Sequence, residues 1–282
     1  YNSVVERWRD IVQGIYICNY DLKNSASGVS KKISSQLQVF RNAGIDMLVL
    51  DHNCLKGKIQ YGFLHNLLIA LKGCSSMDTL ELLKIAEHKI RSDRFDFIYF
   101  RKGLFDAEQI DVIKRIKKID SQIKIIIEIA TYPYDKELKW YRWPWIRNDK
   151  LARRQIKGCV DRIVTYSRDK EIFHVPTISI SNGIVYNSVP LKNVREHIGI
   201  NLIAVALFAE WHGYDRVIEG MYQDIEIVRN NSIHLHLVGS GKVLGKYKKM
   251  VEKYGLSEFV HFYGKKDGTE LDDIYDTADI GL

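Results

Sequence analysis

The chain has 282 residues, of which 46% are hydrophobic and 27% charged, and its formal net charge is +7. This composition is typical of a soluble globular protein, and the length predicts two domains of roughly 100–200 residues each. No apolar run approaches the roughly 20 residues that span a bilayer, and no secretory signal peptide is visible. Four scattered cysteines without a Cys-x-x-Cys pair favour a reduced, cytoplasmic protein.

The first part of the chain alternates apolar strands with amphipathic helices. A glycine- and serine-rich loop over 24–30 joins the first strand to the first helix. The almost wholly apolar segment 123–129 is typical of a parallel strand that is buried on both faces. The apolar periodicity predicts strands at 11–19, 45–50, 95–100, 123–129, 162–166 and 174–180, and helices at 31–42, 64–71, 77–90 and 107–119.

A second strand–helix series begins near Asn201. The strong turn signal Asn182-Gly183 and the loop-like residues after it place a boundary between 182 and 196. We therefore expect domains at 1–183 and 184–282, both of the Rossmann-like α/β type. The second should be incomplete, because the chain ends inside a strand. Its predicted strands lie at 201–208, 233–238, 259–263 and from 279, and its helices at 217–228, 243–254 and 269–277.

Two strand ends in this second series deliver polar residues to one edge of the predicted sheet. Strand 201–208 leads into the loop 209–216, and strand 233–238 is expected to stop at the turn Gly239-Ser240-Gly241-Lys242. Ligands bind at the carboxyl edge of such sheets, and backbone N–H groups at a glycine turn favour an anion such as a diphosphate. The turn is neither a dinucleotide fingerprint, since its third glycine falls a residue late, nor a P-loop. A plain tight turn and a diphosphate cradle both remain open.

The loop 209–216 contains more polar residues than packing requires. Gly213 suits a positive φ, and Asp215 could be a helix N-cap. Those structural roles do not explain Glu210, His212 and Arg216. The loop therefore indicates a ligand site.

Two further groups of polar residues lie on predicted strands. Glu128 interrupts an apolar strand, which is costly unless the carboxylate is paired, so it is either a salt-bridged structural acid or a cleft group. The residues after it, 131–135, include Pro133, for which a strained or cis turn is expected. His234 and His236 share one strand face but have no third ligand nearby, so we interpret them as strand residues covered by a helix rather than as a metal site.

The segment 136–157 combines aromatic and basic side chains. Trp140, Tyr141, Trp143 and Trp145 stand among its lysines and arginines. It is interpreted either as an exposed helix-loop-helix with a solvated face or as a patch that rests on an anionic membrane surface. Nothing in it resembles a recognition helix or an RNP motif, so no nucleic-acid partner is expected.

Taken together, these motifs resemble the GT-B glycosyltransferases, and specifically glycosyltransferase family four in its bacterial surface-polysaccharide members. The resemblance covers nearly the whole chain, in the family's order. It is carried by the segments 27–33, 128–135, 181–184, 209–216, 237–241, 262–264 and 277–280.

The resemblance implies two Rossmann-like domains facing across a cleft, with the acceptor on the first and a UDP- or GDP-linked sugar donor on the second. It implies a hexosyltransferase that retains anomeric configuration, needs no obligatory metal or other cofactor, and builds capsule or other surface polysaccharide on a glycan or lipid-linked acceptor. Such a protein is cytoplasmic or peripheral on the inner face of the cell membrane. The donor side would include Glu210, His212, Gly213, Arg216, Gly239, Gly241, Lys242 and Gly264. The acceptor side or cleft would include Gly28, Val29, Lys31, Glu128, Thr131, Tyr132 and Asp135.

Two departures from the family pattern leave other functions open. Many relatives carry an Arg and a Lys where this chain has Leu207 and His212. The family's Glu-x7-Glu segment, which grips the donor, would lie beyond Leu282, so this chain is expected to be inactive alone. The alternatives are a catalytically inactive nucleotide-sugar-binding homologue and a sugar-nucleotide epimerase of the GT-B type. No residue is assigned a catalytic role.

Overall fold

The computed structural model describes residues 11–23, 28–55, 77–135, 143–183 and 196–282. The chain divides into two compact units, Tyr1–Val185 and Tyr186–Leu282, which are treated separately below. The helix predicted at 64–71 lies outside the described residues. None of the helices in the described ranges has the length and hydropathy needed to cross a bilayer.

Unit 1 is built on a sheet with the strand order β2-β1-β3-β4-β5-β7-β6. Every neighbouring pair is parallel except β6 with β7. The strands are β1 (Gln13–Ile17), β2 (Asp46–Leu50), β3 (Phe97–Lys102), β4 (Lys124–Ile129), β5 (Arg162–Thr165), β6 (Glu171–Ile172) and β7 (Val175–Ser179). The predicted strands are therefore present, and the short hairpin strand β6 is added to them.

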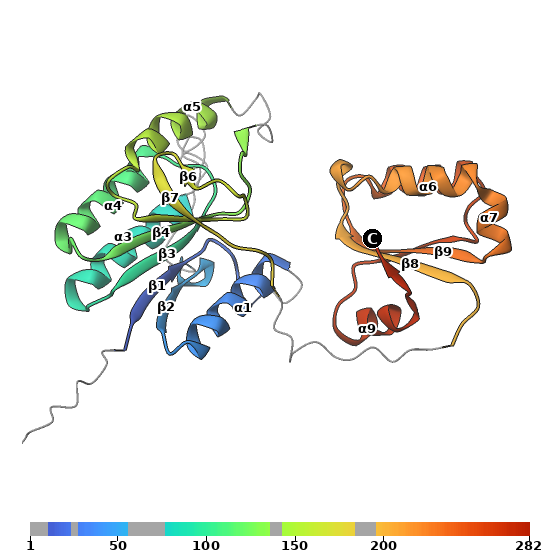
Figure 1. The fold of residues 1–282 in the computed structure, drawn as a ribbon, viewed down its shortest axis with the longest axis horizontal. Coiled ribbons are helices and arrows are strands. Elements are labelled where there is room, and N and C mark those ends of the chain that lie inside the picture. Colours follow the sequence, from blue (N-terminus) through green and yellow to red (C-terminus); the bar gives the residue numbers. More distant parts are fainter. Residues whose placement is uncertain (1–10, 24–27, 56–76, 136–142, 184–195) are drawn as a thin grey trace, which may run out of the picture. The chain divides into compact units, whose positions relative to one another are not determined.

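Helices cover both faces of this sheet. Figure 1 shows α1 on one side and α3, α4 and α5 on the other. The main core lies between the sheet and the second group, and a smaller core lies under α1. The helical elements are α1 (Gly28–Asn42), η1 (His52–Leu55), α3 (Met77–Ser92), α4 (Ala107–Ile119), α5 (Trp143–Ala152) and η4 (Arg153–Gln155).

The start of α1 corrects one prediction. Gly28, Val29 and Ser30 were expected in a loop, but they form the first turn of the helix. Ser30 is buried, and its hydroxyl donates to the Asp21 carbonyl at 2.9 Å, which fixes this turn against the end of β1. A polar sequence therefore forms helix here because its buried serine has a backbone partner.

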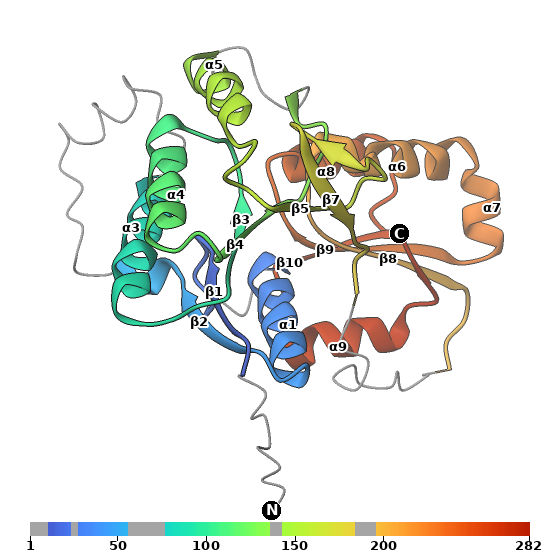
Figure 2. The same cartoon turned by 60° about the vertical axis from the view of Figure 1, so that its left-hand side comes forward.

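Unit 2 is built on a fully parallel sheet with the order β10-β9-β8-β11. Its strands are β8 (Ile200–Leu207), β9 (Ile233–Ser240), β10 (Val260–Gly264) and β11 (Ile280–Gly281). Figure 1 shows α6 and α9 on opposite sides of this sheet, and Figure 2 shows α8 on the side of α6. The helical elements are η6 (Glu210–His212), α6 (Tyr214–Gln223), α7 (Ile225–Asn230), α8 (Leu244–Lys253) and α9 (Gly268–Thr277).

Two expectations for unit 2 were wrong. Strand β9 does not stop at Gly239, because Gly239 and Ser240 still pair with Ala206 and Leu207 of β8. The single helix predicted at 217–228 is two helices, because Asp224 leaves helical geometry with φ −106° and ψ 39°. The main core of this unit lies under α6 and α8.

Candidate functional site

The strand order of unit 2 identifies the edge where a ligand would bind. In chain order the sheet reads 3-2-1-4, so the direction of strand addition reverses between β8 and β11. In open α/β sheets, ligands bind outside the carboxyl ends of the strands at such a switch point. The loop 209–216 follows β8, and the turn Gly241–Lys242 follows β9, which pairs with β8 along its whole length. The two predicted donor segments therefore lie at adjacent strand ends.

The loop after β8 is held by its own histidine. The Ala209 N–H donates to His212 Nδ1 at 3.1 Å, and the His212 N–H donates to the Ala209 carbonyl at 3.1 Å. Because Nδ1 is the acceptor, the neutral ring carries its proton on Nε2 and presents a donor there. The imidazole also stacks on Tyr214, with ring centroids 5.7 Å apart. His212 is therefore a pre-oriented side chain that stands at the switch-point edge.

Gly213 adopts the left-handed conformation that the sequence predicted, with φ 73°. Gly213, rather than Asp215, is the N-cap of α6. Asp215 lies inside the first turn of the helix and forms an ion pair with Lys246 at 2.6 Å. This pairing lowers the pKa of the Asp215 carboxyl, chiefly through the hydrogen bond from Lys246.

Two cations at this edge are exposed to solvent. Arg216 packs its guanidinium against Gly213, where a Cβ atom would lie 2.4 Å from Arg216 Nη2. Lys242 is exposed in the turn after β9. Within the described part of the chain, neither Arg216 nor Lys242 has an ion-pair partner. Exposed cations without an ion-pair partner can bind the oxygens of a phosphate group.

The glycines of the β9 turn allow the two segments to approach closely. A Cβ on Gly239 would lie 1.9 Å from the Ala206 carbonyl oxygen, and one on Gly241 would lie 2.1 Å from the Phe208 carbonyl oxygen. Gly264, at the end of β10, has φ 68°, and a Cβ added there would meet nothing within 4 Å. Gly239 and Gly241 are thus required for contact between the strands, while Gly264 is required for its backbone conformation.

Where the resemblance predicts an Arg and a Lys, this chain has Leu207 and His212, and both are exposed. Leu207, at the end of β8, is 74% exposed, and Trp211 is 83% exposed. Glu210 is also exposed and begins η6. Arg216 and Lys242 are therefore the cations that this edge offers.

Glu128 lies in a buried polar cluster of unit 1. Its side chain is 0% exposed and accepts hydrogen bonds from Tyr99 at 2.7 Å, Arg101 at 3.0 Å and Gln36 at 3.1 Å. Burial and the neighbouring Glu128 carboxylate raise the pKa of the Tyr99 hydroxyl. Burial raises the pKa of the Tyr166 hydroxyl to about 12, with Glu128 adding to the effect. Of the two interpretations open for Glu128, the structure favours the salt-bridged structural acid.

The other residues predicted for the acceptor side lie on two elements of unit 1. Gly28, Val29 and Lys31 are in the first turn of α1, which follows β1. Thr131, Tyr132 and Asp135 are in the loop after β4, where the Tyr132–Pro133 peptide is cis. Thr131 and Asp135 are exposed, and Tyr132 is half-buried.

The structure adds two partners that the sequence did not indicate. Asp135 forms an ion pair with Arg153 at 3.1 Å, and Tyr132 packs edge-on against Phe173 with centroids 5.7 Å apart. Arg153 lies over the Phe173 ring at 4.7 Å. Phe173 has a positive φ of 51° in the β6–β7 turn, a conformation for which a bulky aromatic gives no sequence signal. Of segment 136–157, residues 136–142 lie outside the described ranges, including Trp140 and Tyr141.

The paired histidines of β9 lie on the α9 side of the sheet of unit 2. His236 hydrogen-bonds Tyr263 at 2.8 Å and Asn201 at 3.1 Å, and His234 lies 3.1 Å from His261. Burial lowers the pKa of His236 to about 4, and neighbouring histidines add to the effect. The residues that the structure describes contain no group of three His, Cys, Asp or Glu that could hold a metal ion.

Comparison with known proteins agrees with this architecture. Residues 192–282 match the family model described as glycosyl transferases group 1. The lipopolysaccharide outer core galactosyltransferase WaaB in its apo form has a similar fold, with a TM-score of 0.54 and 11% identity over 95% of this chain and 72% of its own. A structure described as trehalose-6-phosphate from E. coli bound with UDP-2-fluoro glucose has a TM-score of 0.50 and 10% identity over 96% of this chain and 77% of its own.

The coverage of longer relatives is smaller, and the identities are low throughout. The chain spans 39% of the pneumococcal O-GlcNAc transferase GtfA in complex with UDP and GlcNAc, at 9% identity over 71% of this chain and a TM-score of 0.46. No curated protein sequence matches the chain. Likeness at such identities concerns the fold alone. The chain thus has the two-Rossmann α/β fold of the GT-B glycosyltransferases, and its residues 192–282 match the glycosyl transferases group 1 family.

Proposed function

We propose that the protein is a retaining glycosyltransferase that moves a hexose from a UDP- or GDP-linked donor to a glycan or lipid-linked acceptor in bacterial surface-polysaccharide synthesis. The observation that carries the proposal lies in unit 2, which contains the family match. There the loop 209–216 and the glycine turn after β9 end together at the switch point, with two exposed cations.

The donor diphosphate is bound in this proposal by unit 2. Arg216 and Lys242 supply positive charge beyond the ends of β8 and β9, which the close approach at Gly239 and Gly241 holds together. His212 donates from Nε2 to the transferring sugar or a phosphate oxygen, since its Nδ1 is already occupied. These donors stabilise the charge that develops on the diphosphate as the bond between the sugar C1 and its phosphate oxygen breaks and the acceptor oxygen bonds to C1. No metal or other cofactor is included in the proposal.

The acceptor side is assigned to unit 1. The first turn of α1 and the loop after β4 follow the carboxyl ends of β1 and β4, and they carry Lys31, Thr131, Tyr132 and Asp135. Glu128, near the end of β4, stabilises this region through its buried hydrogen bonds with Tyr99 and Arg101. The aromatic and basic segment 136–157 rests on the anionic inner face of the membrane, so the enzyme is cytoplasmic and peripheral.

A second function is favoured by one observation. Leu207 is 74% exposed at the end of β8, where many family members place a cation. A missing phosphate clamp is compatible with a homologue that binds a nucleotide sugar without transferring it. Calorimetry on the whole protein separates the two functions, because the inactive homologue binds donors and never releases UDP or GDP.

The test of the proposed function is a donor panel. The whole protein is incubated with UDP- and GDP-sugars, with and without a bacterial lipid extract, and nucleotide release and thermal shift are measured. One donor should raise the melting temperature and be turned over. No turnover and no nucleotide-dependent thermal shift with any donor would overturn both the transferase and the inactive homologue.

A further inference from the structure

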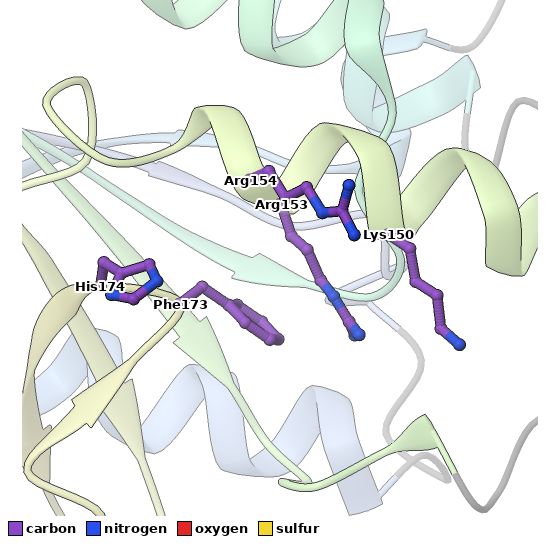
Figure 3. Close-up of a pocket in the computed structure, with 5 residues that line it drawn as sticks. All are labelled: Lys150, Arg153, Arg154, Phe173 and His174. Carbon is purple, nitrogen blue, oxygen red and sulfur yellow. The ribbon is translucent and has the colours of Figure 1, made fainter.

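A second cationic cavity lies in unit 1, outside every residue that the donor proposal uses. It has a volume of about 370 Å³ and is lined by Lys150, Arg153, Arg154, Phe173 and His174. The three cations come from one helical stretch, α5 with η4, and the other two residues come from the β6–β7 turn (Figure 3). Its volume falls in the range of roughly 300–1,000 Å³ that is usual for small-molecule sites.

Arg153 forms the anchored wall of this cavity. Its Nη1 contacts Asp135 at 3.1 Å and Asp149 at 3.4 Å, and its guanidinium lies 4.7 Å from the centre of the Phe173 ring. Figure 3 shows the Arg153 side chain extending beside this ring. All of these carboxylate contacts fall on Nη1, so Nη2 and Nε have no carboxylate partner among the described residues. A guanidinium that is held in place and retains free donors is suited to bind an oxyanion.

Lys150 and Arg154 line the cavity beside Arg153. Both are exposed, and neither has an ion-pair partner within the described ranges. Three carboxylates lie near the cavity: Asp135 and Asp149 both contact Arg153, and Glu171 lies 3.3 Å from His174. Among the described residues none of the three forms an ion pair with Lys150 or Arg154, so these two cations can turn to a bound anion.

We propose that this cavity, the Arg153 pocket, binds a phosphate or diphosphate group carried by a larger molecule. Lys150, Arg153 and Arg154 bind the phosphate oxygens, and the Phe173 ring contacts the apolar part next to the phosphate. The phosphate belongs either to a soluble phosphorylated sugar or to a phospholipid headgroup, and the two sources present the same oxygens to the pocket. The pocket uses no residue of the proposed donor site in unit 2. Its cations belong to the segment 136–157 that the proposed function places on the membrane, so the headgroup source rests on that proposal and names the group that the segment binds.

The test measures binding of inorganic pyrophosphate by calorimetry and co-sedimentation with phosphatidylglycerol or phosphatidylcholine vesicles. The test variant is Lys150→Gln with Arg154→Gln, which leaves the buried contacts of Arg153 intact. The matched control is Lys249→Gln with Lys253→Gln, which removes the same charge from another basic cavity, on α8. Circular dichroism checks that both variants fold.

We expect the test variant to weaken binding about tenfold or more and the control to change it less than about twofold. Loss of pyrophosphate binding alone assigns a soluble phosphorylated ligand, and loss of phosphatidylglycerol binding assigns a headgroup. Equal weakening by both variants, or no binding of the unaltered protein to either probe, would overturn the pocket. Pyrophosphate could also bind at the proposed donor edge of unit 2, so the pocket is judged by the difference between the two variants. Sugar transfer is measured separately, with the donor panel, and its failure leaves that difference unchanged.

Discussion

The charged residues of the two units are used in opposite ways. In unit 1, Glu128 is 0% exposed and is surrounded by hydrogen-bond donors. In unit 2, Arg216 and Lys242 are exposed at a strand edge without an ion-pair partner among the described residues. A charged side chain can be buried only when it has hydrogen-bond or ion-pair partners in the protein. A side chain that binds a charged ligand must instead lack such a partner. The difference separates a structural cluster from a candidate binding edge, although both stood out equally in the sequence.

The largest effect on activity is expected at the strand edge of unit 2 that carries Arg216 and Lys242. Arg216→Gln should lower kcat/KM for the nucleotide sugar by about 100-fold, because one charge-assisted contact to the developing diphosphate is lost. The melting temperature should stay unchanged, since Arg216 is exposed. Arg229→Gln on α7 is the control and should leave both quantities unaltered. Equal activity in the two variants would remove Arg216 from the site.

A substitution in the buried cluster around Glu128 should lower the stability of the protein and leave donor binding unchanged. Glu128→Ala leaves Arg101, whose side chain is 12% exposed, without its carboxylate. We expect a loss of about 3–5 kcal/mol in the free energy of unfolding, measured by urea denaturation. Glu81→Ala removes the surface pair with Lys84 and should cost less than about 1 kcal/mol. Similar losses in both variants would mean that the cluster is no more important for stability than a surface pair.

The next prediction concerns the close contact between strands β8 and β9 at Gly239. Gly239→Ala would bring a Cβ to 1.9 Å from the Ala206 carbonyl oxygen, so β8 and β9 must separate. We expect a loss of about 3 kcal/mol in stability, measured by hydrogen exchange at β9 amides. Gly220→Ala in α6 meets nothing within 4 Å and should be neutral or stabilising by about 0.5–1 kcal/mol. Unchanged exchange in Gly239→Ala would refute the close approach.

The smallest effect concerns pH. The pKa of His236 is about 4 in the fold against an ordinary 6.5, so the ring is neutral when folded. The contribution of neutral His236 to the free energy of unfolding is present above pH 6.5. It is lost as the pH falls toward 4, because the unfolded state then binds a proton that the folded ring does not. Between pH 7 and pH 5 unit 2 should lose roughly 2 kcal/mol. His236→Gln should flatten this dependence in urea titrations at several pH values, and an unchanged slope would exclude His236 as its source.

Most of the fold followed from periodicity, while the contacts between distant segments did not. The helix Ala107–Ile119 was predicted with its observed bounds because its apolar spacing is regular. Strand β4 followed from its continuous apolar run. The end of β9 was misplaced because a glycine normally signals a turn, whereas here it allows the Ala206 carbonyl to approach. That reason depends on β8, about thirty residues away in the chain.

The candidate sites were predictable to different degrees. His212 and Arg216 were selected because packing did not require them, and the structure places both beside Gly213. Arg153 and Phe173 were missed, since a basic residue after a helix and an aromatic in a hairpin turn are each unremarkable alone. They become a pocket only when α5 and the β6–β7 turn lie together. The sequence had indicated the charge of that region but not its cavity.

The hydrogen bond from the Phe208 N–H to the Ser240 carbonyl, at 2.7 Å, has a consequence for motion. It is the last rung of the ladder between β8 and β9, and the loop 209–216 and the turn at Gly241 both begin just beyond it. A movement of either segment that leaves the sheet intact begins beyond this hydrogen bond. The two segments therefore share one hinge, and the Phe208 amide proton should exchange with solvent far more slowly than those of Trp211 and Lys242.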